Sequence, residues 1–477
     1  MNRTSIFLGT ATVLALVALV VGLPRLTGST TTVSSTATST SKAVTVPTVS
    51  DGSLSMEARL SHPFVAVGRQ DVFVTVDVRG VEVPHAARAP VNLALVIDRS
   101  GSMSGFKLNQ AKQAARQLVS QLTSDDRLVI VHYGSEVKSL EGLFATQENK
   151  GRMLSYIDGI WDEGGTNIGA ALATGRDALA KAKSDFRGNR LILVSDGQPT
   201  EGVTEFSGLT SIVREIRAQG ISVSSLGVGD DFNEQLMSSI AEVGAGAYGY
   251  LQDAAQLAQV FQKDLSAAGT QVARTVAVTF RVPAGAKLER VLGYSQVTRA
   301  FDGTTELVTV ALPDFAAGQR ERLVAQFTVE ATADAQPVEV SGLTLDYYDL
   351  LKGADLSSRA HLSAMASASQ EAVTKNRDGE AIVFAARARA AANAEQAAKR
   401  LEQGDRTGAR QLLQSNVALF NEASGAAGVG AVADDLKDNE EQLRGADRAQ
   451  SESDVRMYKK AVNAKARRNY GLMGSTY

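Results

Sequence analysis

The chain has 477 residues, of which 44% are hydrophobic and only 9 are proline, so it can bury more than one core and form about three domains. Its formal net charge of −3 gives no indication that it binds nucleic acid. It contains no cysteine, which excludes disulfides, thiolate metal sites and a lipid anchor on an N-terminal cysteine.

The N-terminal segment is apolar. Arg3 precedes an uncharged run from Ile6 to Leu23, so residues 1–26 are predicted to be a signal peptide or a signal anchor. No A-x-A cleavage pattern is present, and Arg3 favours a retained membrane anchor with the N-terminus inside. Residues 27–52 are rich in Ser and Thr and predict a flexible linker. We therefore expect a cell-envelope protein with its bulk outside the cytoplasm, or a secreted protein if the segment is cleaved.

The next segments predict a domain inserted in a β-sandwich. Residues 53–90 and 269–362 alternate with period two, as in Val72, Val74, Val76 and Val78, which indicates strands on both sides of a central block. In residues 91–268, strands near 93–97, 128–132, 191–194 and 221–226 alternate with helices near 108–122, 168–182, 209–219, 234–243 and 254–267. This alternation predicts an α/β domain with a doubly wound, Rossmann-like parallel sheet.

The C-terminal residues 363–477 are rich in Ala, Glu, Gln, Lys and Arg and predict helices. Runs at 380–401 and 407–420, separated by Gly404 and Asp405, favour a helical hairpin packed on the sandwich over a tetratricopeptide unit, since no repeat period is detectable. The basic positions between Lys459 and Arg468 favour a solvated helix face, with contact to an acidic surface as the alternative.

Five oxygen-bearing side chains follow the predicted strands and helices of the central block: Asp98, Ser100, Ser102, Thr166 and Asp196. Asp98 and Asp196 come directly after buried strands, and the carboxyl ends of such strands share ligand sites in open α/β sheets. Glycines beside the two serines and before Thr166 permit the tight turns that would bring the side chains together. Two carboxylates and three hydroxyls suit Mg²⁺, Mn²⁺ or Ca²⁺, of which we expect Mg²⁺.

The order DxSxS, then a Thr after glycines, then SDG after an apolar strand resembles the von Willebrand factor type A domain with an intact metal-ion-dependent adhesion site. The resemblance implies that Asp98, Ser100, Ser102, Thr166 and Asp196 bind the cation directly or through water. It further implies that an Asp or Glu carboxylate of a protein partner completes the metal shell. The strand-rich flanks look like those of bacterial cell-envelope proteins with this domain and, more distantly, of inter-alpha-trypsin inhibitor heavy chains.

Catalysis finds little support in the sequence. The histidines, His62, His85, His132 and His361, lie in no metal-ligand spacing, and no G-x-S-x-G motif is present. We therefore expect a non-enzymatic, cation-dependent binding protein for adhesion or complex assembly. The alternative is a structural subunit in which the metal only stabilises the domain and contacts run through the sandwich or the helices.

Overall fold

The computed structural model describes residues 52–83, 88–229, 232–251 and 254–471. The predicted signal or anchor at residues 1–26, residues 27–51 of the predicted linker and His85 lie outside the described residues. None of the helices formed by the described residues combines the length and hydropathy needed to cross a membrane.

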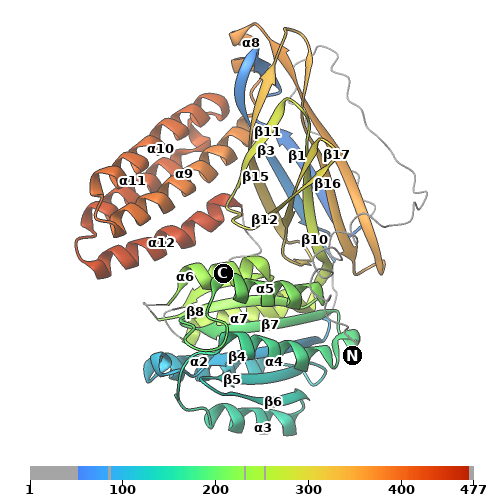
Figure 1. The fold of residues 1–477 in the computed structure, drawn as a ribbon, viewed down its shortest axis with the longest axis vertical. Helices are drawn as coiled ribbons and strands as arrows, with labels where there is room; N and C mark the ends of the chain where they lie inside the picture. Colours follow the sequence, from blue (N-terminus) through green and yellow to red (C-terminus); the bar gives the residue numbers. More distant parts are fainter. Residues whose placement is uncertain (1–51, 84–87, 230–231, 252–253, 472–477) are drawn as a thin grey trace, which may run out of the picture. The chain divides into compact units, whose positions relative to one another are not determined.

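The central block forms an α/β domain around one sheet (Figure 1), with strand order β6-β5-β4-β7-β8-β9. The strands are β4 (Val91–Asp98), β5 (Arg127–Tyr133), β6 (Val137–Phe144), β7 (Gly188–Ser195), β8 (Ser222–Val228) and β9 (Ala245–Leu251). β4 pairs in parallel with both β5 and β7, so its carboxyl end lies between theirs.

Helices cover both faces of this sheet. One face packs on α2 (Phe106–Gln121), α3 (Gln147–Asp158) and α7 (Ala254–Gly269), and the other on α4 (Ile168–Ala180), α5 (Phe206–Ala218) and α6 (Glu234–Val243). Leu93, Leu95 and Ile97 of β4 belong to the first core, whereas Ala94 and Val96 belong to the second. Every β4 residue is therefore buried, which explains its unbroken apolar run.

The sequence predicted a parallel sheet, but the sheet is mixed. The edge strand β6 pairs antiparallel with β5, and its residues are mostly exposed or half-buried, so it lacks a clear apolar alternation. The helix α3 that follows buries only Met153 and Ile157, which is too few for a recognisable period. The strand β9 is parallel but glycine-rich, and was also not predicted.

Strands from both sides of the α/β domain share one core. One sheet has the order β1-β3-β15-β11, with β1 (Leu54–Leu60), β3 (Gly68–Gly80), β11 (Ala286–Leu292) and β15 (Arg320–Ala331). The other has the order β12-β13-β10-β16-β17-β2, with β2 (Phe64–Ala66), β10 (Gln271–Val282), β12 (Val297–Asp302), β13 (Thr305–Ala311), β16 (Pro337–Asp349) and β17 (Ala354–Ser367), and the short β14 (Phe315–Ala316) pairs with β10. Because β3 precedes the α/β domain and pairs along its length with β15, which follows it, that domain is inserted in the sandwich.

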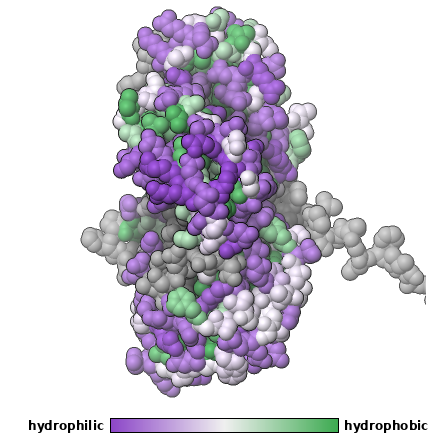
Figure 2. Space-filling model, turned by 90° about the vertical axis from the view of Figure 1, so that its left-hand side faces the viewer, coloured by the Kyte–Doolittle hydropathy of each residue, from purple (hydrophilic) through white to green (hydrophobic). Residues whose placement is uncertain are grey.

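The C-terminal region is helical, with α8 (Gln370–Lys375), α9 (Gly379–Glu402), α10 (Arg406–Ala427), α11 (Ala433–Arg448) and α12 (Glu452–Tyr470). Short 3-10 turns occur at η1 (Gly101–Met103), η2 (Lys183–Asp185) and η3 (Val429–Ala431). β17 continues to Ser367, so the predicted helical start at residue 363 is wrong by several residues. The predicted hairpin corresponds to α9 and α10. Hydrophilic residues predominate on the side of the molecule that Figure 2 shows.

The basic stretch on α12 is not the solvated face that the sequence indicated. Lys459 pairs with Glu402 at 2.8 Å and Lys465 with Asp438 at 2.6 Å. Lys460 lies 3.3 Å from the carbonyl of Gly229 in the α/β domain. Of the five basic positions, which are Lys459, Lys460, Lys465, Arg467 and Arg468, only Arg468 is exposed.

Candidate metal centre

Asp98 ends the central strand β4 and is completely buried. Its Oδ1 accepts a hydrogen bond from the backbone N–H of Ser100 at 2.8 Å. Its Oδ2 accepts from the Ser195 hydroxyl at 2.6 Å and from the Tyr133 hydroxyl at 3.3 Å. These donors come from the ends of β5 and β7, the two neighbours of β4, so the carboxylate is held where three strands end.

The two serines of the motif lie on the turn that follows. Ser100 is buried and Ser102 is exposed, and their hydroxyl oxygens are 3.1 Å apart. The turn is closed by the N–H of Met103, which donates to the carbonyl of Ser100 at 2.9 Å, and the buried Met103 side chain anchors it in the core. Ser102 thus brings the site to the protein surface.

Thr166 lies in a loop that hydrogen bonds connect to the loops of both aspartates. The N–H of Gly101 donates to the carbonyl of Gly164 at 3.1 Å, and the N–H of Thr166 donates to the Thr200 hydroxyl at 2.8 Å. Gly164 has a φ of +75°, and a Cβ there would lie 2.6 Å from the Ser135 hydroxyl, so a side chain is excluded at this position. The 2% exposed Thr166 is therefore held next to the loops that follow β4 and β7.

Asp196 follows β7 and is 1% exposed. Its Oδ1 is buried without a hydrogen-bond partner, whereas its Oδ2 lies 3.3 Å from the ammonium nitrogen of Lys107, in the first turn of α2. A buried carboxylate oxygen without a donor is costly in a protein interior. Asp196 therefore offers a coordination position to a cation.

The electrostatics of the site also favour a cation. Burial raises the pKa of the Asp98 carboxyl to about 6, although hydrogen bonds from Ser100 and Ser195 lower it, and the nearby Asp196 raises it further. The described residues contain no group of three or more His, Cys, Asp or Glu side chains that could hold a metal, so the candidate ligand set rests on two carboxylates and three hydroxyls. Such a set fits a hard divalent ion, because oxygen ligands suit it and a double positive charge offsets both buried carboxylates.

The family model of the von Willebrand factor type A domain matches residues 92–263. The chain contains a von Willebrand factor type A domain. Domains of this type bind protein partners, are common in adhesion and typically bind a divalent metal. The match covers the sheet and helices from β4 to α7 and leaves the sandwich and the C-terminal helices outside it.

Solved structures show that the wider architecture also occurs elsewhere. A von Willebrand factor type A protein from Catenulispora acidiphila superposes with a TM-score of 0.65 over 89% of this chain and 98% of its own, at 17% identity. The ArnB paralog VWA2 from Sulfolobus acidocaldarius gives a TM-score of 0.55 over 88% of this chain and 99% of its own, also at 17% identity. At this identity the likeness concerns the fold alone.

Curated relatives are similar over shorter stretches. YfbK of Escherichia coli is 30% identical over 212 residues, which are 43% of this chain and 36% of that protein. Inter-alpha-trypsin inhibitor heavy chain H2 of Mus musculus is 30% identical over 185 residues, which are 36% of this chain and 20% of that protein. The chain thus matches well under half the length of these relatives.

Three residues of the candidate metal centre were missed in the sequence: Tyr133, Ser195 and Lys107. Ser195 directly precedes Asp196, and its hydroxyl both donates to Asp98 and accepts the N–H of Gly197 at 2.8 Å. The position of Ser195 directly before Asp196 could have marked it as a site residue in the sequence. Tyr133 and Lys107 gave none, since each reaches the site from an element that is adjacent only in the folded protein.

We predict that Lys107→Met strengthens binding of Mg²⁺ to the metal-stripped protein by at least tenfold. The ammonium of Lys107 already neutralises Asp196, so an incoming ion must displace this contact or share the carboxylate with it. Calorimetric titration measures the change. The control is Lys181→Met, which removes a 65% exposed lysine of the same domain, and equal affinities in the two variants would contradict the prediction.

Proposed function

We propose that the type A domain captures a protein partner through a divalent cation held by Asp98, Ser100, Ser102, Thr166 and Asp196. Mg²⁺ is the cation we expect, with Mn²⁺ or Ca²⁺ as alternatives, and an Asp or Glu carboxylate of the partner is the final ligand. The observation that carries this proposal is the unpartnered, buried Oδ1 of Asp196 beside the buried Asp98, in a group of loops that reaches the surface at Ser102.

The charges explain why the partner's ligand would be acidic. Asp98 and Asp196 offset the charge of a divalent ion, but Asp196 also contacts the ammonium of Lys107, so its negative charge is shared between two cations. An incoming carboxylate adds negative charge and can bind the ion directly, whereas an amide or a hydroxyl adds no negative charge. The bound ion would supply the attraction and the direction of the contact, and the chain's own residues would hold it in place.

We further propose a non-enzymatic role in the cell envelope, with residues 1–26 as a signal or a retained anchor. The type A domain and the absence of a motif for nucleophilic catalysis in the sequence support the first part. The apolar N-terminal run after Arg3 supports the second.

The test compares the wild-type chain with Ser100→Ala in a pull-down from a cell-envelope extract of the source organism. We expect a partner that is retained with Mg²⁺, released by chelation and lost with Ser100→Ala, because one hydroxyl ligand is missing. Esterifying the carboxyl groups of the extract beforehand should abolish retention. The proposal would be overturned in favour of a structural subunit if retention of the partner did not depend on the metal and was equal in both proteins, and Ser100→Ala lowered only the melting temperature.

A further inference from the structure

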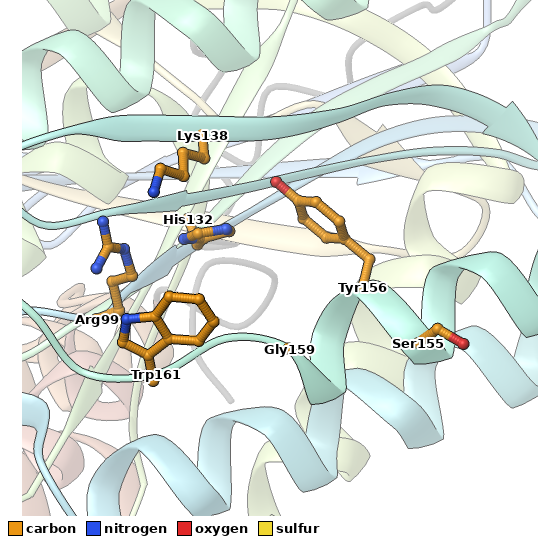
Figure 3. Close-up of a pocket in the computed structure, with 7 residues that line it drawn as sticks. All are labelled: Arg99, His132, Lys138, Ser155, Tyr156, Gly159 and Trp161. Carbon is orange, nitrogen blue, oxygen red and sulfur yellow. The ribbon is translucent and has the colours of Figure 1, made fainter.

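A pocket of about 270 Å³ opens beside the candidate metal centre, in the same domain but on the side of the edge strand β6. Figure 3 shows its lining residues, which are Arg99, His132, Lys138, Ser155, Tyr156, Gly159 and Trp161. They come from the turn after β4, from β5 and β6, and from α3 with the segment that follows it. The volume lies just below the range of ~300–1,000 Å³ usual for small-molecule sites, so it suits a ligand about the size of one side chain.

Two polar nitrogens of the lining are buried without a partner. Arg99 is 2% exposed, and its Nη1 contacts Glu163 Oε2 at 2.8 Å, but its Nε has no acceptor. The Nδ1 of His132, a residue that is 8% exposed, likewise has no partner. Buried nitrogens without partners are rare in folded proteins, because each has lost its hydration. A ligand oxygen in the pocket would accept a hydrogen bond from Arg99 Nε, and from His132 Nδ1 in the imidazole tautomer that carries its proton there.

The lining also provides aromatic surface. Trp161 is 64% exposed and is the single tryptophan of the chain. The Tyr156 ring lies 5.4 Å from the His132 ring between centroids, and in Figure 3 Trp161 lies on the other side of His132, below the guanidinium of Arg99. Flat side chains of this kind bind planar apolar groups and are enriched where partners contact a protein.

Counted without the weakly held, exposed Glu136, the charged groups at the pocket leave one excess positive charge. Arg99 and Lys138 are cationic, and the contact with Arg99 keeps the pKa of the Glu163 carboxyl below its usual value, so Glu163 is anionic. His132 is neutral at pH 7, because burial and then Arg99 lower its pKa to about 4. Lys138 has one more neighbour, the 76% exposed Glu136 at 3.8 Å, and such a surface pair holds it weakly. The complementary ligand is therefore a monoanion.

We propose that this pocket binds a single carboxylate carried on a small planar apolar group, with Arg99 Nε and the Lys138 ammonium as its donors and Trp161 against its apolar part. The occupant is either a free small carboxylic acid or the C-terminus of a protein partner that ends in an aromatic residue. Neither source requires the metal centre, because none of the five candidate metal ligands lines the pocket.

The test uses the fluorescence of Trp161 in the metal-stripped full chain, in the presence of a chelator, during titration with sodium benzoate. Because the chain has no other tryptophan, the signal reports on this pocket alone. Benzyl alcohol, which lacks the charge, and acetate and inorganic phosphate, which lack the ring, are titrated in parallel. A short peptide ending in phenylalanine, with a free or an amidated terminus, then competes with benzoate.

We expect a saturable change with benzoate and at least a fivefold loss of affinity in Lys138→Met, with no loss in Lys181→Met, which removes a lysine outside the pocket. His132→Leu, which removes the unpartnered Nδ1, should also weaken binding. Competition by the free peptide and not by the amide identifies a protein terminus as the source, and the lack of competition identifies a free acid. A linear, variant-independent quench, or saturation by phosphate equal to that by benzoate, overturns the proposal.

Discussion

Asp98→Asn is expected to weaken divalent-cation binding by at least a hundredfold while leaving the protein folded. The amide keeps an oxygen for the N–H of Ser100, and its nitrogen can donate to the hydroxyl oxygens of Ser195 and Tyr133, so the buried hydrogen bonds can be rearranged without a void. The ion, in contrast, keeps only one of two carboxylates in a site that is otherwise made of neutral hydroxyls. Calorimetric titration with Mg²⁺, Mn²⁺ and Ca²⁺ measures the loss.

The matched control is Asp125→Asn, which removes the same charge from an exposed position of the same domain. Its affinity for the cations should equal that of the wild type. Thermal melting of both variants without metal checks that they are folded. Unchanged affinity in a folded Asp98→Asn protein would exclude Asp98 as a ligand and, with it, the proposed cation-dependent capture.

The second large effect concerns the strands that hold the inserted domain. Asp77 of β3 is 5% exposed and accepts hydrogen bonds from Arg320 Nε at 2.9 Å and from Arg322 Nε and Nη2 at 2.8 and 2.7 Å. Burial raises the pKa of Asp77, but the hydrogen bonds from the two arginines outweigh this and keep it below its ordinary value. This cluster joins the strand before the type A domain to the strand after it.

We predict that Asp77→Ala lowers the free energy of unfolding by about 3–5 kcal/mol, because the 8% exposed Arg322 would remain buried without its counter-charge. Urea denaturation followed by circular dichroism measures this loss. Asp71→Ala changes an exposed aspartate on the same strand, which also contacts β15, and should cost less than about 1 kcal/mol. Similar losses of stability in both variants would show that the buried cluster does not stabilise the pairing of β3 with β15.

The sequence allowed much of the type A domain to be predicted, because its core strands and helices carry strong periodic signals. The unbroken apolar run of β4 follows from the burial of this strand on both faces. The helical spacing of apolar residues in α2 follows from the burial of one face of that helix. The edge elements β6 and α3 were missed since they bury few residues, and they contribute Lys138, Ser155 and Tyr156 to the pocket beside the candidate metal centre.

By itself the sequence determined the α/β class and the flanking strands and predicted the five candidate oxygen ligands, because periodicity and strand-end positions are local properties of the chain. Only the tertiary structure decided that Lys107 meets Asp196, that Ser195 and Tyr133 hold Asp98, and that Arg99 and His132 line a pocket with Trp161. Each of these contacts joins segments far apart in the chain. Their formation depends on strand order and register, which the packing of the whole core sets and no local pattern encodes.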